Sequence, residues 1–377
     1  MRISDVQHQP RAHRIIWRAL ASRRMPHAYL FTGPEGVGRE MLAVSLAQVL
    51  LCASPVKRTG LEGQGPEEEI SDACGECQDC RLVEAGTHPD LFLIYRQLGK
   101  QHPDPLVRKR LATQLGVDVV RHFLIAQAGH HPSRGRAKVF IVREAERMND
   151  EAQNALLKTL EEPPPDTFII LLAPSLDRML PTTRSRCQHV PFQALPVEFV
   201  HERLRALRPD ADPAAMSYAA RHSGGSLGQA LQVIDDGIYA MKRTWGGRLA
   251  ELAAAGPAFA AHALAGPFEA DARALAKLIA ERDPDISDTD ATRGGIRILL
   301  GVLADFYVDA LRKAGGADLP PINADQPEVI AALLRRNNAD SISAALRAIQ
   351  NTESNLARNA NIQLTLEGLF IHLGHSA

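Results

Sequence analysis

Residues 33–40 read Gly-Pro-Glu-Gly-Val-Gly-Arg-Glu and constrain the fold more than any other segment. Gly33, Gly36 and Gly38 keep the frame of the loop G-x-x-x-x-G-K-[ST], whose backbone N–H groups cradle phosphates. A buried strand signal at 28–32 precedes the loop and a helical pattern follows it. Because this loop requires a strand before it and a helix after it, the sequence predicts an α/β domain built on a phosphate-loop frame.

The two residues that give such a loop its chemistry are replaced. Arg39 stands where a Lys would reach the β- and γ-phosphates, and Glu40 stands where a Ser or Thr would hold Mg²⁺. Arg143 follows the strand signal at 138–142, where an ATPase of this kind places an Asp on Mg²⁺, and Glu144 remains where a catalytic base would sit. We therefore expect a degenerate nucleotide site, without bound nucleotide and without hydrolysis.

Strand signals alternate with helical segments in the first half of the chain, at 92–94, 138–142 and 168–172. This alternation predicts a parallel sheet covered by helices. Residues 53–72, rich in Pro, Gly and Glu, are expected to form a flexible insertion, and 97–110 a polar loop.

After residue 196 the strand signals stop and Ala-rich helical segments run to residue 377. The breaks between them predict three domains: an α/β domain at 1–196, a small helical domain at 197–242 and a larger helical domain at 243–377. The net charge of −1 does not predict binding to nucleic acid. No apolar run is long enough to predict a transmembrane helix.

Cys74, Cys77 and Cys80 form C-x-x-C-x-x-C, and Cys52 ends the helical segment upstream. Four thiolates at this spacing can hold a tetrahedral Zn²⁺, and four protein ligands leave no open position, so the metal would be structural. His88 is an alternative fourth ligand, and an iron–sulfur cluster or unliganded cysteines remain open. Clustered cysteines of this kind favour a reducing, cytoplasmic location.

Residues 138–164, KVFIVREAERMNDEAQNALLKTLEEPP, closely resemble the clamp-loader ATPases of the AAA+ class, most specifically over 154–164. Ser-Arg-Cys at 185–187 resembles the arginine-finger motif of that family, with Arg186 as the finger. The segment Asn-Ala-Asn-Ile-Gln-Leu at 359–364 resembles the family's closing helix. A second similarity is the cysteine run followed by Gly-Thr-His-Pro-Asp, which resembles the family's zinc module and would span about 52–90.

The resemblance implies an AAA+ α/β domain with a zinc module, a small helical lid and an all-α collar. It implies a hetero-pentameric ring of motor subunits, a delta subunit and this chain, which loads a sliding clamp on primed DNA within DNA polymerase III. Structural zinc would be the chain's own cofactor, and ATP would bind only at the neighbouring subunit's site.

The departures from the motif separate this chain from the motor subunits of that family. Arg39, Glu40 and Arg143 replace the nucleotide-binding residues, and Gly228 stands where motor subunits carry a sensing Arg. We therefore expect a noncatalytic subunit, without ATPase or polymerase activity of its own, which supplies Arg186 to a neighbour's ATP. The alternatives are a motor-type ATPase that binds and hydrolyses ATP itself, and a zinc-dependent DNA-binding module.

Overall fold

The computed structural model describes residues 2–22, 24–58, 70–110, 112–134, 136–255, 261–358 and 360–375. The chain divides into two compact units, Met1–Pro196 and Val197–Ala377. The first unit holds the sheet, and the second contains only helices among its described elements. The further division of the second unit into a lid and a collar stays a prediction.

Five parallel strands form the sheet of the first unit, in the order β4-β5-β6-β1-β7. Their bounds are Ala28–Thr32 for β1, Leu91–Ile94 for β4, Lys138–Val142 for β5, Thr167–Ala173 for β6 and Gln188–Pro191 for β7. β1 and β5 are buried along their whole length, as expected of strands covered on both faces. The predicted α/β class with a parallel sheet is thus confirmed. The sequence did not reveal β7, in which Val190 alone is fully buried.

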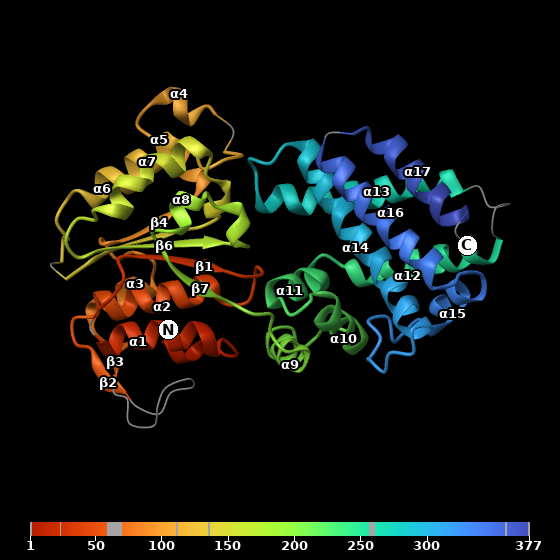
Figure 1. Cartoon of the computed structure of the whole chain (residues 1–377), viewed down its shortest axis with the longest axis horizontal. Coiled ribbons are helices and arrows are strands. Elements are labelled where there is room, and N and C mark those ends of the chain that lie inside the picture. Colours follow the sequence, from red (N-terminus) through yellow and green to blue (C-terminus); the bar gives the residue numbers. More distant parts are fainter. Residues whose placement is uncertain are drawn as a thin grey trace. The chain divides into compact units, whose positions relative to one another are not determined.

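Helices cover both faces of this sheet (Figure 1), with α1, α2 and α3 on one face and α5, α6 and α7 on the other. Their bounds are Pro10–Ser22 for α1, Arg39–Leu51 for α2, Gln78–Glu84 for α3, Val117–Val120 for α5, Ala126–Ala128 for α6 and Asp150–Glu161 for α7. The short helix α8, Pro181–Arg184, lies between β6 and β7. A π-helical stretch, Arg121–Ile125, joins α5 to α6, so the chain is helical without a break from Val117 to Ala128.

Two expected loops carry more structure than their composition predicts. Within 53–72, Val56–Arg58 (β2) pairs antiparallel with Ile70–Asp72 (β3), and residues 59–69 between them lie outside the described residues. The buried carboxylate of Asp72 pairs with Arg58 at 3.1 Å, a cross-strand contact that composition does not reveal. The segment 97–110 contains a 3₁₀ helix, Arg96–Gln101, and the single-turn helix α4, Pro105–Arg108, which Asp104 caps.

The second unit is an all-helical body. Its helices are α9 Val197–Leu207, α10 Pro213–His222, α11 Leu227–Asp235, α12 Ile238–Ala255, α13 Ala265–Arg282, α14 Asp288–Ala314, α15 Pro327–Arg336, α16 Ala339–Ala357 and α17 Ile362–His375. Trp245, Phe268 and Phe370 meet in its core, with ring centroids 4.8 to 5.8 Å apart. No helix among the described residues is both long and apolar enough to cross a membrane.

A buried lysine lies within the second unit. Lys242 of α12 is fully buried, and its Nζ lies 2.5 Å from Oδ1 of Asp325. The same Nζ lies over the rings of Tyr218, Tyr239 and Phe306 at 5.2 to 5.6 Å. Burial lowers the pKa of Lys242, and the Asp325 carboxylate opposes that shift. The Asp325 carboxylate therefore balances the positive charge of the buried Lys242 ammonium group.

Asp325→Ala should destabilise the chain by about 3 kcal/mol, because removing one partner of a buried ion pair leaves the other charge uncompensated. Asp235→Ala is the matched control, since Asp235 pairs with Arg208 at 2.7 Å on the surface and its loss should cost much less. Urea unfolding of both variants measures the difference. Equal losses would show that the charge of Lys242 is not held by Asp325.

Candidate functional site

The glycine loop has the backbone shape that its sequence frame requires. Gly33, Gly36 and Gly38 have φ of 147°, 70° and 99°, values that side-chain-bearing residues rarely adopt. A Cβ on Gly33 would also lie 2.6 Å from the carbonyl oxygen of Phe192. Gly38 precedes α2 directly, so the loop runs from β1 into a helix N-terminus. The phosphate-loop frame is therefore kept in three dimensions, although its reactive side chains are changed.

The charge of Arg39 is compensated inside the protein. Burial lowers the pKa of Arg39, and the nearby carboxylates of Glu35 and Glu146 oppose that shift. Burial in turn raises the pKa of Glu146, with Arg39 acting in the opposite direction. The cation at the motif's lysine position thus has two protein carboxylates as neighbours.

Glu40 and Arg143 bind each other, with Arg143 Nη2 donating to Glu40 Oε1. They come from the first turn of α2 and from the end of β5, 103 positions apart in the chain. The contact forms because β1 and β5 flank β6 in a parallel sheet, so both strands end at one edge. Glu40 and Arg143 stand at the two motif positions that would hold Mg²⁺. An ion pair within the chain therefore links the two positions at which a working phosphate loop would have its Mg²⁺ ligands.

Glu144, at the position of a catalytic base, also has a partner. Its Oε2 accepts from Arg96 Nε at 3.0 Å, and its Oε1 lies 3.9 Å from Arg147 Nε. Its backbone is left-handed, with φ of 49°. The Glu144 carboxylate is thus already engaged by two guanidinium groups of its own unit.

The four cysteines lie together. The Sγ atoms of Cys52, Cys74, Cys77 and Cys80 are within 4.8 Å of one another, and the group can hold a metal ion. Three backbone N–H groups donate to these sulfurs at 3.3 to 3.4 Å. Tetrahedral thiolate sites need this closeness, and the donor set suits zinc. The residues present therefore fit a structural metal.

The thiols differ in how readily they lose a proton. Burial raises the pKa of Cys52 and of Cys80. Burial acts in the same direction on Cys77, but hydrogen bonds from the N–H groups of Cys80 and Ala53 and from neighbouring thiols lower its pKa to about 6. Cys77 also caps the N-terminus of α3, where the helix dipole favours an anion. Among Cys52, Cys77 and Cys80, Cys77 alone thus has a lowered pKa.

His88 is placed outside the cysteine cluster. Its Nδ1 accepts the N–H of Asp90 at 3.1 Å, and its Nε2 lies 3.4 Å from Oδ1 of Asp79. Asp79 also pairs with Arg134, and Asp90 accepts the N–H groups of Ser133 and Arg134. The fourth cysteine of the cluster is therefore Cys52. His88 instead contacts Asp79, which also pairs with Arg134 in the segment before β5.

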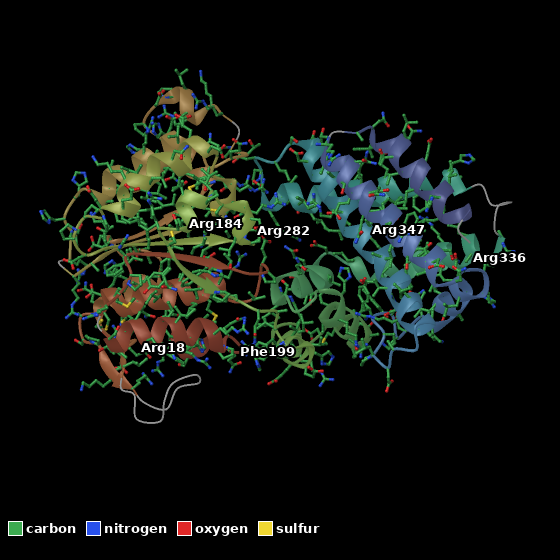
Figure 2. All side chains as sticks on the ribbon, viewed as in Figure 1. Arg18, Arg184, Phe199, Arg282, Arg336 and Arg347 are labelled. Carbon is green, nitrogen blue, oxygen red and sulfur yellow. The ribbon has the colours of Figure 1, made fainter. Side chains whose placement is uncertain are left out.

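Arg186 lies in the short connection between α8 and β7. Its side chain is 32% exposed, and it contacts the carboxylate of Glu161 and the carbonyl oxygen of Thr182. Figure 2 labels Arg184, two residues earlier, at the end of α8. The guanidinium is thus near the surface and held by neighbours of its own unit.

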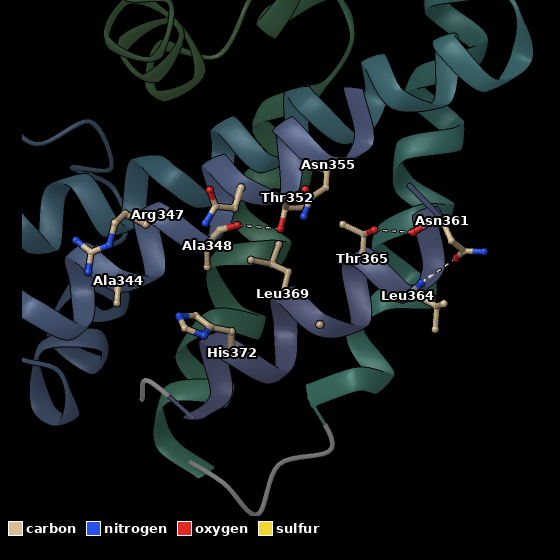
Figure 3. A pocket seen from close by; sticks show the side chains of 12 residues that line it. Ala344, Arg347, Ala348, Thr352, Asn355, Asn361, Leu364, Thr365, Leu369 and His372 are labelled. Carbon is tan, nitrogen blue, oxygen red and sulfur yellow. Dashed lines mark hydrogen bonds between the residues drawn. The ribbon is translucent and has the colours of Figure 1, made fainter. Parts of the chain in front are cut away.

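A surface groove runs between α16 and α17 in the second unit (Figure 3), with a volume of about 740 Å³. Its lining includes the polar side chains of Arg347, Asn355 and His372, and Leu364, which is 68% exposed. The closing-helix segment 359–364 contributes Asn361 to this lining, whereas Asn359 lies outside the described residues. The groove offers a mixed polar and apolar surface for contact with another molecule.

The comparisons with known proteins are consistent along most of the chain. The family described as DNA polymerase III, delta subunit, matches residues 8–196, and the family described as its C-terminal part matches 295–375. The DNA polymerase III subunit delta' of Escherichia coli is 29% identical over 351 residues, 93% of this chain and 89% of that protein. The chain belongs to the DNA polymerase III delta-prime family. The delta' subunit of Pseudomonas aeruginosa is 35% identical over 228 residues.

The delta-prime relatives match over unequal lengths. The Pseudomonas aeruginosa match covers 59% of this chain and 60% of the relative. The tau subunit of Escherichia coli DNA polymerase III is 30% identical over 239 residues, 62% of this chain and 33% of that protein. The chain thus spans about 60% of the length of the Pseudomonas aeruginosa relative and about a third of the length of the tau subunit.

Several residues of this delta-prime chain gain meaning only from the structure. Glu161 contacts Arg186, and Arg96 contacts Glu144. Their positions in the chain carry no spacing signal, because each contact joins different elements. The four cysteines, by contrast, share a readable spacing.

The purified protein should contain about one zinc per chain, and Cys77→Ser should lose the metal and melt at a lower temperature, because the binding energy of a structural zinc is folding energy. Cys187→Ser is the control, since Cys187 lies outside the cluster and should keep the metal. Elemental analysis and thermal unfolding provide the readout. A zinc-free wild type, or an iron–sulfur absorption band, would contradict the assignment.

Proposed function

We propose that this chain is a noncatalytic subunit of the DNA polymerase III clamp loader and supplies Arg186 to the ATP site of a neighbouring motor subunit. The ion pair between Glu40 and Arg143 carries the noncatalytic part of the proposal. Membership of the delta-prime family and similarity to a tau subunit support the assignment to a clamp loader.

The altered loop opposes Mg²⁺-ATP for an electrostatic reason. Glu40 would face the phosphate oxygens of a nucleotide, and like charges at such distances repel. Arg143 cannot ligate a cation, and releasing it from Glu40 would cost the pairing energy without providing a metal ligand. The positions that would hold Mg²⁺ in a working phosphate loop are thus occupied by two side chains that pair with each other.

Arg186 suits a role in trans. An arginine finger neutralises charge on the γ-phosphate in the transition state and can come from a neighbouring protein. The guanidinium stays charged and offers two parallel N–H donors to phosphate oxygens. The Ser-Arg-Cys context and the surface position of Arg186 support this use.

The remaining parts have roles that follow from this proposal. The zinc module would be structural, and residues 243–377 would form the collar that joins the chain to motor subunits and a delta subunit in a hetero-pentameric ring. The groove between α16 and α17 lies in that region and offers a surface for such a contact. The assembled ring would load a sliding clamp on primed DNA, and the clamp and DNA would meet this chain within the complex.

The isolated chain should show no Mg²⁺-dependent ATP binding and no ATPase above background, with or without primed DNA, because Arg39, Glu40 and Arg143 replace the motif residues. Restoring them together, as Arg39→Lys, Glu40→Thr and Arg143→Asp, should bring back Mg²⁺-dependent binding. Fluorescent-nucleotide titration and phosphate release measure both. Turnover by the wild type that is lost in Glu144→Gln would instead establish the motor-type alternative.

Arg186→Ala should leave the ring assembled but lower its DNA-stimulated ATPase and clamp loading. Fingers in related phosphate-loop enzymes contribute roughly 10³–10⁵ in rate, and the loss of total turnover here should be smaller because other ATP sites continue to work. Arg186→Lys should rescue only in part, since an ammonium lacks the planar fork. Size-exclusion chromatography with steady-state ATPase tests this, and equal rates in intact rings would remove Arg186 from the mechanism.

A further inference from the structure

We propose that Glu161 is the positioning residue for Arg186, holding its guanidinium so that the terminal N–H edge is free for a neighbour's γ-phosphate. The inference rests on the proposed function, in which Arg186 acts in trans. It assigns a role to a carboxylate at the last residue of α7.

The contact uses one side of the guanidinium. Oε1 of Glu161 accepts from Nε of Arg186 at 2.6 Å and also from Nη2. The guanidinium is planar, so its Nε–H and one Nη2–H point in the same direction. An oxygen in contact with both nitrogens therefore accepts these two N–H groups. The second Nη2–H then points away from Glu161, along the terminal edge of the group.

The other terminal nitrogen has one firm partner and one weak one. Nη1 donates to the carbonyl oxygen of Thr182 at 2.8 Å and lies 3.4 Å from Oγ of Ser185. The longer contact is easily displaced, since hydrogen bonds weaken at such distances. Nη1 and Nη2 can thus each offer one N–H to the same phosphate while Glu161 and Thr182 keep their contacts.

Both partners are anchored by their own backbones. Glu161 is the last residue of α7, directly after Leu160, which is 1% exposed, and prolines follow from Pro163. The N–H of Arg186 donates to the carbonyl oxygen of Thr183 at 3.2 Å. The two side chains therefore meet from fixed starting points, although they are 25 positions apart in the chain.

The value of the contact lies in orientation. An arginine side chain loses rotamer entropy when it is ordered, and ordering it beforehand lowers the cost of ordering it at the reaction. The Glu161 side chain is 46% exposed, so the ion pair itself adds little stability. A weak but directional partner suits a group that must still adjust to the phosphate.

The test uses rings rebuilt with Glu161→Ala, Glu161→Gln or Glu162→Gln chains. Glu162 is the matched control because it is the adjacent exposed carboxylate, without an ion pair among the described residues. Glu161→Ala should lower kcat for DNA-stimulated ATP hydrolysis by the ring, by less than Arg186→Ala does and with KM for ATP unchanged, since a misplaced finger affects the transition state alone. Glu161→Gln, which keeps an acceptor oxygen, should lose less, and Glu162→Gln should match the wild type.

The Arg186→Ala ring separates the two proposals. In that background Glu161→Ala should cause no further loss, because there is no finger left to position. If Arg186→Ala alone leaves the rate unchanged, the proposed function fails. If Arg186→Ala slows the ring while Glu161→Ala behaves like Glu162→Gln, the positioning role fails and the finger stands. A faster ring with Glu161→Ala, or additive losses in the double variant, would also overturn the positioning role.

Discussion

The parallel pairing of β5, β6 and β1 is the constraint on which the rest of the first unit depends. Parallel strands end at one edge of their sheet, so residues that follow different strands meet there. This pairing brings Arg143 to Glu40 across 103 positions of the chain. In an ATPase the same edge would gather metal ligands around a nucleotide. Here the edge gathers opposite charges that satisfy each other.

The phosphate-loop frame thus keeps its architecture although the residues at its metal and phosphate positions are changed. The glycine loop retains its left-handed backbone, and ion pairs compensate the charges of Glu40 and Glu144. Arg186, the residue that we propose acts at a neighbouring site, lies before β7 on the opposite flank of β1.

The sequence predicts those features whose signal is local. Buried apolar runs mark β1 and β5, and the C-x-x-C spacing marks the cysteine centre, because each depends on neighbours in the chain. The sequence does not predict β7, because this strand has only four residues and only one of them is fully buried. The sequence does not predict the pairing of β2 with β3 either, because the surrounding segment is rich in Pro and Gly and the contact of Arg58 with Asp72 forms only across the two strands. The contact of Glu161 with Arg186 has no local signal at all, since tertiary folding alone brings α7 beside the connection after α8.

The most direct test of the central claim is a structure of the assembled ring with an ATP transition-state analogue bound. The account predicts that loop 33–40 of this chain holds no nucleotide and that Glu40 stays paired with Arg143. It also predicts that the terminal N–H groups of Arg186 lie within hydrogen-bonding distance of the γ-phosphate mimic in a neighbour's site. A nucleotide seated on loop 33–40, or Arg186 distant from every analogue in the ring, would contradict it.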